Sequence, residues 1–191
     1  MNYLRWSSDH QPGLCVIKIP VFDDKPLNLA QPLQSTWPDN VTTAMCSEFP
    51  DDIALADNLY GSYHAIISEK MKLFLQQEIS DGSIEYLPIT IINHKGRAEP
   101  DPYYVLHPRT LVDCIDLEAS EVEWNPLDPE EINDCEGLVL NTDAIPENCR
   151  LFRLTHWGSE ILVRSDLAEK LEEEGFTGLY FPEAEGYDGI G

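Results

Sequence analysis

Positive charge is scarce in this chain. Its 191 residues include 12 lysines and arginines against 35 aspartates and glutamates, which gives a formal net charge of -23. Such a surface repels nucleic acid phosphates and anionic membranes, and it speeds association with basic partners at low salt. We therefore expect neither nucleic acid nor a membrane as a partner. A high net charge also keeps a protein soluble, so the composition alone requires no partner.

The usual sequence signals of catalysis and metal binding are missing. The cysteines never show the C-x-x-C spacing of zinc or redox sites, and the five histidines are equally dispersed. There is no phosphate-binding loop, dinucleotide fingerprint or G-x-S-x-G nucleophile motif. We therefore expect no cofactor, no metal and no catalytic residue. The odd number of scattered cysteines predicts reduced thiols and a cytoplasmic protein: Cys15, Cys46, Cys114, Cys135 and Cys149.

Long apolar runs are also lacking. No stretch approaches the roughly 20 apolar residues of a membrane-spanning helix. The opening residues, MNYLRWSSDHQPG, are too polar for a signal peptide. Both observations agree with a cytoplasmic protein.

Proline divides the chain into two regions. Residues 1–56 contain six prolines, and only Leu14–Ile19 has the character of a strand there. We predict a wrapping segment anchored by Trp6, Phe22 and Trp37. Residues 57–191 then form an α+β domain, and both regions belong to one compact unit, as the chain length suggests.

The stretch from Leu151 to Pro182 has the clearest pattern. It predicts a strand, a short apolar run, a helix with Ser165 as its N-cap that ends at Gly175, and a closing strand. A similar pattern runs from Ile66 to Pro88, where Ser68 is the expected N-cap. The buried residues predicted for these units are Leu75, Leu171 and Phe181.

The predicted fold class is α+β, with a mixed or antiparallel sheet, few helices and two similar helix–strand units. A degenerate duplication explains the similarity, but helix–strand units also recur in unrelated α+β domains, and the sequence leaves both interpretations open. Two further β-rich runs, Tyr103–His107 and Leu111–Ile115, predict a hairpin, and Leu138–Leu140 predicts a short strand.

The most acidic segment, Asp116 to Asp134, is predicted to be a surface excursion. Trp124 lies within it and can act as an anchor in a protein interface. The alternative is a solvated loop with Trp124 tucked into the core. Paired carboxylates here also suit acid–base chemistry, but strand alternation would point Asp113 and Asp116 to opposite faces. The candidate partner-binding residues are Asp116, Glu118, Glu121, Glu123, Trp124, Asp128, Glu130 and Glu131.

Several short motifs occur in an order and spacing that resemble one known family. They are Ile67-Ser68-Glu69-Lys70, Tyr86-Leu87-Pro88, Tyr103-Tyr104-Val105-Leu106, Val112-Asp113, Leu151-Phe152-Arg153-Leu154, Val163, Ser165 and Gly175-Phe176-Thr177-Gly178-Leu179. The family is the immunity-eleven family of bacterial polymorphic toxin systems, formerly a domain of unknown function. His107-Pro108 departs from the pattern, because the hairpin strand is expected to continue there without proline.

The resemblance implies a non-enzymatic immunity protein that binds and neutralises a cognate toxin. An acidic surface is compatible with a basic toxin. Two alternatives from other classes stay open: a scaffold or regulatory module that binds another protein, and a hydrolase with an unfamiliar site. The sequence determines neither the toxin, nor the binding face, nor the oligomeric state.

Overall fold

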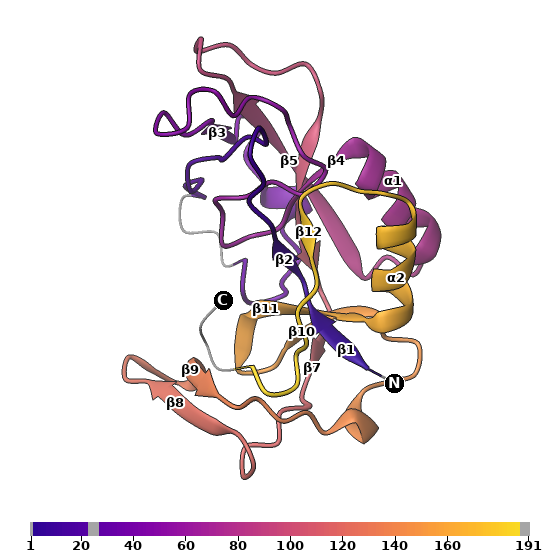
Figure 1. Ribbon diagram of the computed structural model, residues 1–191. Coiled ribbons are helices and arrows are strands. Elements are labelled where there is room, and N and C mark those ends of the chain that lie inside the picture. Colours follow the sequence, from indigo (N-terminus) through magenta and orange to yellow (C-terminus); the bar gives the residue numbers. More distant parts are fainter. Residues whose placement is uncertain (1, 23–26, 188–191) are drawn as a thin grey trace.

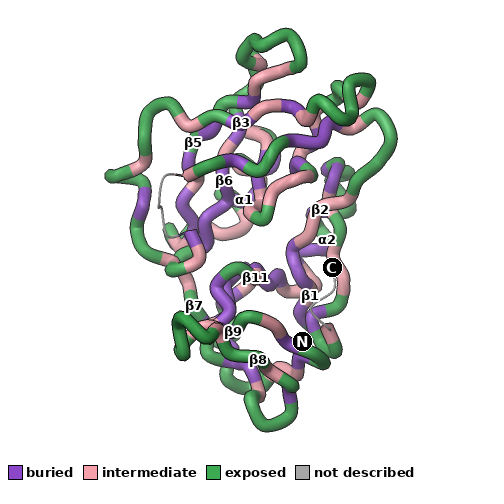
Figure 2. Tube along the Cα trace, turned by 90° about the vertical axis from the view of Figure 1, so that its left-hand side faces the viewer, coloured by how far each residue is buried: buried purple, intermediate pink, exposed green. Residues whose placement is uncertain are grey.

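The computed structural model describes residues 2–22 and 27–187. Two α-helices and several mixed or antiparallel sheets confirm the predicted α+β class. Figure 1 shows two sheets one above the other, both helices on one side, and a separate hairpin at the lower end. Buried stretches run through the strands of both sheets, while the loops at the two ends are exposed (Figure 2).

The upper sheet has the strand order β3–β5–β6–β4. Strand β6 pairs antiparallel with β4 and β5, and β3 pairs parallel with β5. In β5 the buried Leu87, Ile89 and Ile91 alternate with exposed Pro88 and Thr90, as expected for a strand with one face on the core. The bounds are Thr42–Ala44 for β3, Ile66–Ser68 for β4, Ile84–Ile92 for β5 and Tyr103–Pro108 for β6.

The lower sheet has the strand order β1–β11–β10–β7. Two pairs of strands stand apart from the four-stranded sheets: β2 with β12, and β8 with β9. The lower-sheet strands are β1 (Tyr3–Arg5), β7 (Leu111–Val112), β10 (Leu151–Leu154) and β11 (Trp157–Arg164). The others are β2 (Ser7–Ser8), β8 (Glu121–Asn125), β9 (Asp128–Glu136) and β12 (Leu179–Tyr180), with 3-10 helices at Gln34–Thr36 and Thr142–Ala144.

Helices α1 (Glu69–Glu78) and α2 (Ser165–Glu173) share one cluster of buried apolar side chains. Leu75 of α1 and Leu171 of α2 are fully buried in it, as predicted. Phe181 is only partly buried, so that expectation was wrong. Its ring lies at the boundary of the cluster, edge-on to Trp6 with 5.6 Å between the ring centroids.

The two helices begin differently. Ser68 is the N-cap of α1, as predicted, and its Oγ accepts a hydrogen bond from the Met71 N–H at 3.3 Å. Ser165 is instead the first residue of α2, whose N-cap, Arg164, makes no side-chain cap bond. The cap prediction was therefore wrong there. The Arg164 guanidinium binds the Asp166 carboxylate in the first turn of α2 instead.

The two helix–strand units share a topology. In each unit a strand leads into the helix, and the chain after the helix runs parallel to that strand with one antiparallel strand between them. In the second unit this last pairing is an isolated bridge beyond β12, and β12 itself pairs with β2. In the first unit β6 lies between β4 and β5, with Val105 opposite both Ile66 and Leu87. In the second, Leu4 of β1 pairs with Val163 and Glu183. The similarity thus extends to strand pairing, while descent from one duplicated unit stays a prediction.

Three local strand predictions were wrong. Leu111–Ile115 does not form a hairpin with Tyr103–His107, because β4 and β5 occupy both edges of β6, and β7 pairs parallel with β10. Leu14–Ile19 and Leu138–Leu140 make only isolated bridges, such as Ile17 with Met45 and Ile115 with Leu140. The sequence also gave no indication of the short strands β1, β2 and β3.

The N-terminal region reaches the core at several points. Cys15, Ile17 and Leu33 are buried with side chains of β5 and β6. The Trp37 indole N–H donates to the Pro88 carbonyl at 2.8 Å. Near β11 the chain passes so close to Gly158 that a Cβ there would lie 1.9 Å from the backbone oxygen of Asn28. The boundary at residue 56 stays a prediction.

One buried side chain, Asn58, joins three distant segments. Its Oδ1 accepts from the Trp6 indole N–H at 3.1 Å, and its Nδ2 donates to the carbonyls of Ser7 and Gly178. Its backbone N–H donates to the Thr177 carbonyl at 3.0 Å. Because Asn58 is only 1% exposed, these hydrogen bonds replace the ones that its polar atoms would otherwise form with water.

Candidate functional site

Most of the predicted partner-binding segment is a β-hairpin on the surface. Strands β8 and β9 pair antiparallel from Glu121–Glu136 to Asn125–Asp128, with Pro126 and Leu127 at the turn. The register shifts on either side of Trp124. Valine, tryptophan and isoleucine at alternate positions give the segment its strand character. The hairpin projects from the lower end of the molecule, and its tip is exposed (Figures 1 and 2).

The hairpin is fastened to the turn between β10 and β11. His156 in that turn has a positive φ of 69°. One ring nitrogen, Nδ1, lies 2.8 Å from the Glu130 carbonyl oxygen, and the Ile132 N–H donates to the His156 carbonyl at 2.6 Å. The Trp124 ring stands edge-on to the imidazole, with 5.6 Å between centroids. The part of the hairpin next to its turn is therefore attached to the body of the protein, which reduces the conformational entropy lost on binding.

Most of the predicted binding residues come together on this hairpin. Glu121, Glu123, Asp128 and Glu130 are exposed, and Trp124 is 37% exposed. The Trp124 side chain is thus neither buried in the core nor fully exposed to solvent. Glu131 is half-buried and accepts from the Asn28 and Asn125 side-chain amides.

The first two predicted residues lie outside the hairpin. Asp116 and Glu118 belong to the turn that precedes β8. The Asp116 Oδ1 accepts from the backbone N–H groups of Glu118 and Ala119, each at 3.1 Å, so this carboxylate stabilises a turn. Asp116 is half-buried, while Glu118 is exposed.

Sequence reasoning missed the most exposed apolar side chain of the site. Leu127, at the hairpin tip, is 93% exposed. It follows a proline and precedes an aspartate, which is a usual composition for a turn. Nothing in that local pattern shows whether the leucine folds back onto the protein or points into solvent. Asp134 and Glu136 of β9 also add charge that the prediction left out.

The charge around the hairpin is uncompensated. Between Arg109 and Arg150 the sequence has 12 carboxylates and no lysine or arginine, a signal that was available from the sequence. Among the described residues, no hairpin carboxylate forms an ion pair. Like charges crowded on a small element repel each other and lower its stability. A cationic partner would remove that repulsion.

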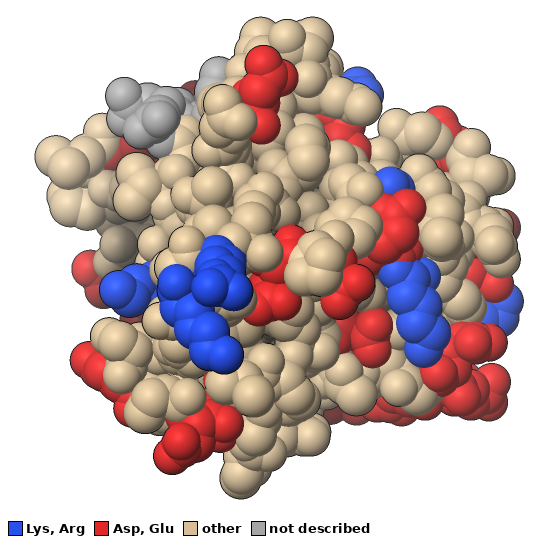
Figure 3. Space-filling view, turned by 90° about the horizontal axis from the view of Figure 1, so that it is seen from above, with Lys and Arg blue, Asp and Glu red and all other residues tan. Residues whose placement is uncertain are grey.

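Several of the described cations form ion pairs away from the hairpin. Arg150 and Lys170 both bind the Glu78 carboxylate, at 2.9 and 2.7 Å. Arg5 pairs with Glu160 at 2.9 Å, and Lys72 with Glu69 at 3.0 Å. Figure 3, viewed from above, shows the face opposite the hairpin with blue and red side chains side by side on a mostly uncharged surface. The hairpin thus differs from the surroundings of Glu78, Glu160 and Glu69, where a cation lies beside each carboxylate.

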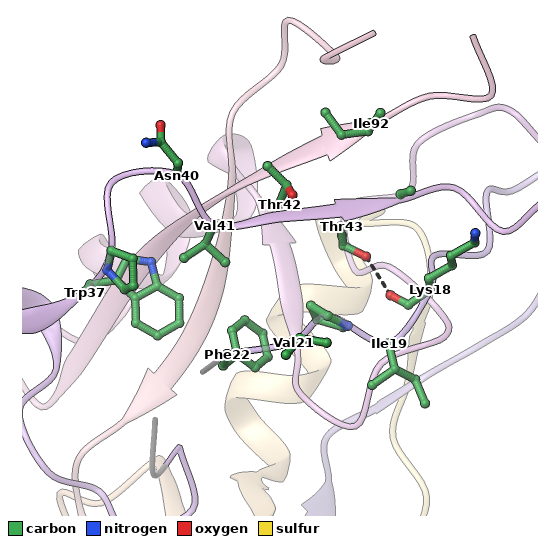
Figure 4. A pocket seen from close by; sticks show the side chains of 13 residues that line it. Lys18, Ile19, Val21, Phe22, Trp37, Asn40, Val41, Thr42, Thr43 and Ile92 are labelled. Atoms are coloured by element: carbon green, nitrogen blue, oxygen red, sulfur yellow. Dashed lines mark hydrogen bonds between the residues drawn. The ribbon is translucent and has the colours of Figure 1, made fainter. Parts of the chain in front are cut away.

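One surface hollow lies beside β3 and is lined by both apolar and polar groups. It encloses about 480 Å³ between the segment Lys18–Phe22 and the residues around Trp37 and Val41. Figure 4 shows the Phe22 and Trp37 rings at one end of it and a hydrogen bond from the Thr43 hydroxyl to the Lys18 carbonyl at the other. Among the described lining residues, Lys18 is the only ionisable one. An acid–base pair for catalysis is not assembled there.

A second and larger hollow of about 1080 Å³ lies between the two halves of the molecule. It holds more polar groups, but they are arranged in local pairs: Glu160 with Arg5, and Asp9 with the Gln11 amide. Burial lowers the pKa of His64 to about 4, so its imidazole is uncharged at neutral pH. Among the described lining residues, no serine hydroxyl is hydrogen-bonded to a histidine ring or a carboxylate, as an activated nucleophile requires.

The four buried cysteines lack the features of reactive thiols. All five are free, and four of them are buried. Burial raises the pKa of Cys114 to about 12 and that of Cys15 and Cys149 to about 11. These thiols are therefore protonated at neutral pH, and only a thiolate is a good nucleophile or metal ligand.

Residues 2–22 and 27–187 also bear on metal binding and membrane insertion. That part of the chain contains no group of three or more histidine, cysteine, aspartate or glutamate side chains placed to hold a metal ion. None of its helices is long and apolar enough to cross a membrane.

Comparison with known proteins identifies the family. The profile of the Immunity protein family (Imm11) matches residues 12–186, which is most of the chain. The protein belongs to the Imm11 immunity protein family. This confirms the resemblance found in the short motifs. No curated protein matches the sequence.

Membership in Imm11 decides the broad class of function. An immunity role follows from the family, and a toxin is the partner that the family implies. Immunity proteins of this kind are generally not enzymes. The match covers β8 and β9, so the acidic hairpin lies within the family region.

Proposed function

We propose that this Imm11 protein binds and neutralises a cognate bacterial toxin by direct contact, without catalysing a reaction. The observation that carries the proposal is the hairpin in contact with His156, which combines unpaired carboxylates with the exposed Leu127 and the half-covered Trp124 ring. Exposed apolar anchors surrounded by charge are typical of protein interfaces. The family match supports the choice of a toxin as the partner.

The toxin surface that fits this hairpin is basic. The candidate contact residues are Asp116, Glu118, Glu121, Glu123, Trp124, Asp128, Glu130 and Glu131, to which the structure adds Leu127. Many toxins that attack nucleic acid are themselves basic, and covering such a surface keeps the substrate away. The proposal excludes nucleic acid and membranes as partners of this chain, because its own surface repels them.

We place this neutralisation in the cytoplasm. The five free cysteines support that location, because buried thiols persist unpaired where the compartment is reducing. A polymorphic toxin system supplies the biological setting, in which the immunity protein protects the cell that makes the toxin.

Co-expression tests the proposal. The protein encoded immediately beside the gene of this chain is expressed in a sensitive host, alone and together with this chain, and growth is measured. We expect the neighbour to stop growth and this chain to restore it, with the two proteins eluting together in size-exclusion chromatography. Binding without protection would support a scaffold or regulatory module instead, and neither binding nor protection would refute the proposal.

A further inference from the structure

A second surface suited to the same partner lies beside the hairpin. The hollow of about 1080 Å³ lies between the loop 58–65 of the upper half and strands β9 and β11 of the lower half. Asn133 and Asp134 of β9 belong both to its wall and to the acidic hairpin. The hairpin and this hollow, named here the tyrosine cleft, therefore form one continuous surface.

Three tyrosines on the wall of the tyrosine cleft are exposed. Tyr63 is 80% exposed, Tyr180 56% and Tyr60 40%. Tyrosine is enriched at protein interfaces and among the residues that dominate binding energy. Because they come from the loop 58–65 and from β12, the cleft has aromatic side chains on two different elements.

The loop that carries Tyr63 is held in place. Gly61 has a φ of 108°, and a Cβ there would lie 2.2 Å from the Ile17 carbonyl oxygen, so the loop lies directly against the N-terminal segment. The His64 N–H donates to the Ser62 Oγ at 3.0 Å, and the Ala65 carbonyl accepts from the Leu106 N–H at 2.9 Å. Tyr63 is thus presented by an ordered backbone, which lowers the entropic cost of binding.

The charge of the cleft selects a cation. Arg5 is neutralised by Glu160, and its guanidinium carbon lies 3.2 Å from the Tyr187 ring centroid. Asp9 and Asp134 also line the cleft, and neither forms an ion pair with a described residue. An incoming guanidinium or ammonium group can form ion pairs with the carboxylates and cation–π contacts with the faces of the tyrosine rings.

We propose that the tyrosine cleft receives an arginine- or lysine-bearing loop of the toxin while the hairpin contacts the adjacent basic surface. This inference rests on the proposed function, because it names a second contact with the same partner. The hairpin supplies charge that speeds encounter, and the cleft supplies the enclosed contacts that slow release.

The test uses the neighbouring-gene protein as the binding probe and measures association and dissociation separately. We expect Tyr63→Ala and Tyr180→Ala each to weaken binding by roughly tenfold or more, through faster dissociation. Tyr63→Phe, which keeps the ring, should retain most of the affinity. The matched control is Leu73→Ala, which removes a side chain that is 49% exposed on α1. Unchanged thermal midpoints show that each variant is folded.

The outcomes separate the two proposals. If the wild-type chain and the control bind and the two tyrosine variants bind equally well, the cleft inference is wrong while the proposed function stands. If the wild-type chain does not bind the neighbouring protein, both fall.

A photo-crosslinking residue at position 63 tests the chemistry of the occupant. We expect it to capture a toxin peptide that contains arginine or lysine. Capture of a peptide without a basic residue, or of a second copy of this chain, would overturn the inference.

Discussion

At the scale of single residues, function and stability lie in different side chains. Asn58 is buried and forms hydrogen bonds with three segments, whereas Leu127 is exposed at the hairpin tip and contributes little to the stability of the fold. The two residues therefore give opposite expectations for mutation.

Asn58→Ala should destabilise the protein by about 2–4 kcal/mol. The change leaves the Trp6 indole N–H and the carbonyls of Ser7 and Gly178 without their partner in a buried setting, where each lost bond is costly. Urea denaturation measures the loss. Asn148→Ala, at an exposed asparagine, is the control, and equal stability of the two variants would show that the junction contributes nothing.

Leu127→Ala should leave stability within about 0.5 kcal/mol of wild type, because the side chain is already in water. Toxin affinity should nevertheless fall through faster dissociation, since an apolar tip loses its contact with the partner. Surface plasmon resonance with the neighbouring-gene protein measures the association and dissociation rates. Leu73→Ala again serves as the control. A wild-type dissociation rate for Leu127→Ala would show that the hairpin tip is not part of the interface.

At the scale of elements, the carboxylates of the hairpin β8–β9 and Glu78 of α1 have opposite electrostatic surroundings. The hairpin gathers carboxylates without cations, while Glu78 at the end of α1 is held by Arg150 and Lys170. The first arrangement costs stability and favours binding, and the second stabilises the fold.

Neutralising the hairpin should separate these effects. A variant with Glu121, Glu123, Asp128 and Glu130 changed to their amides should be at least as stable as wild type, because like-charge repulsion is removed. It should associate with the toxin more slowly at low salt and show a flatter salt dependence. The control changes four other exposed acids: Glu169, Glu172, Glu173 and Glu174 of the α2 region. Wild-type association by the hairpin variant would show that this element is not the binding face.

Glu78→Gln should lower stability by about 1 kcal/mol or less near neutral pH. Hydrogen bonds from Lys170 and Arg150 lower the pKa of Glu78 below its ordinary value of 4.5 in the folded state. Its stabilising contribution is therefore present above pH 4.5 and is lost as the pH falls through the lowered pKa. The difference in urea midpoint between wild type and variant should shrink on acidification, and a difference that grows would contradict the assignment.

At the scale of the whole molecule, the net charge of -23 opposes compactness. Long-range repulsion among the carboxylates is screened by salt. We expect the thermal midpoint to rise as sodium chloride increases from about 10 mM to about 500 mM. Differential scanning calorimetry measures it, with the amide hairpin variant as comparison. A midpoint that falls steadily with salt would mean that attractive ion pairs outweigh the repulsion.

Much of the local structure follows from the sequence alone. Apolar spacing predicted α1 and α2 and the burial of Leu75 and Leu171, and Ser68 was correctly predicted as an N-cap. These features depend on neighbouring residues, so the sequence contains their signal directly. The same is true of the acidic composition and of the motifs that resemble the immunity family, which the family match confirms.

Tertiary structure decided which strands pair and what stays exposed. The sequence predicted that Leu111–Ile115 would pair with its neighbour, but β7 lies against β10, and β1 lies against β11 from the other end of the chain. The exposure of Leu127, the position of Trp124 on His156 and the tyrosine cleft likewise depend on segments far apart in sequence. The alternation of apolar and polar residues along a strand specifies which face is buried, but it does not specify the neighbouring strand. The neighbour depends on how the whole chain packs.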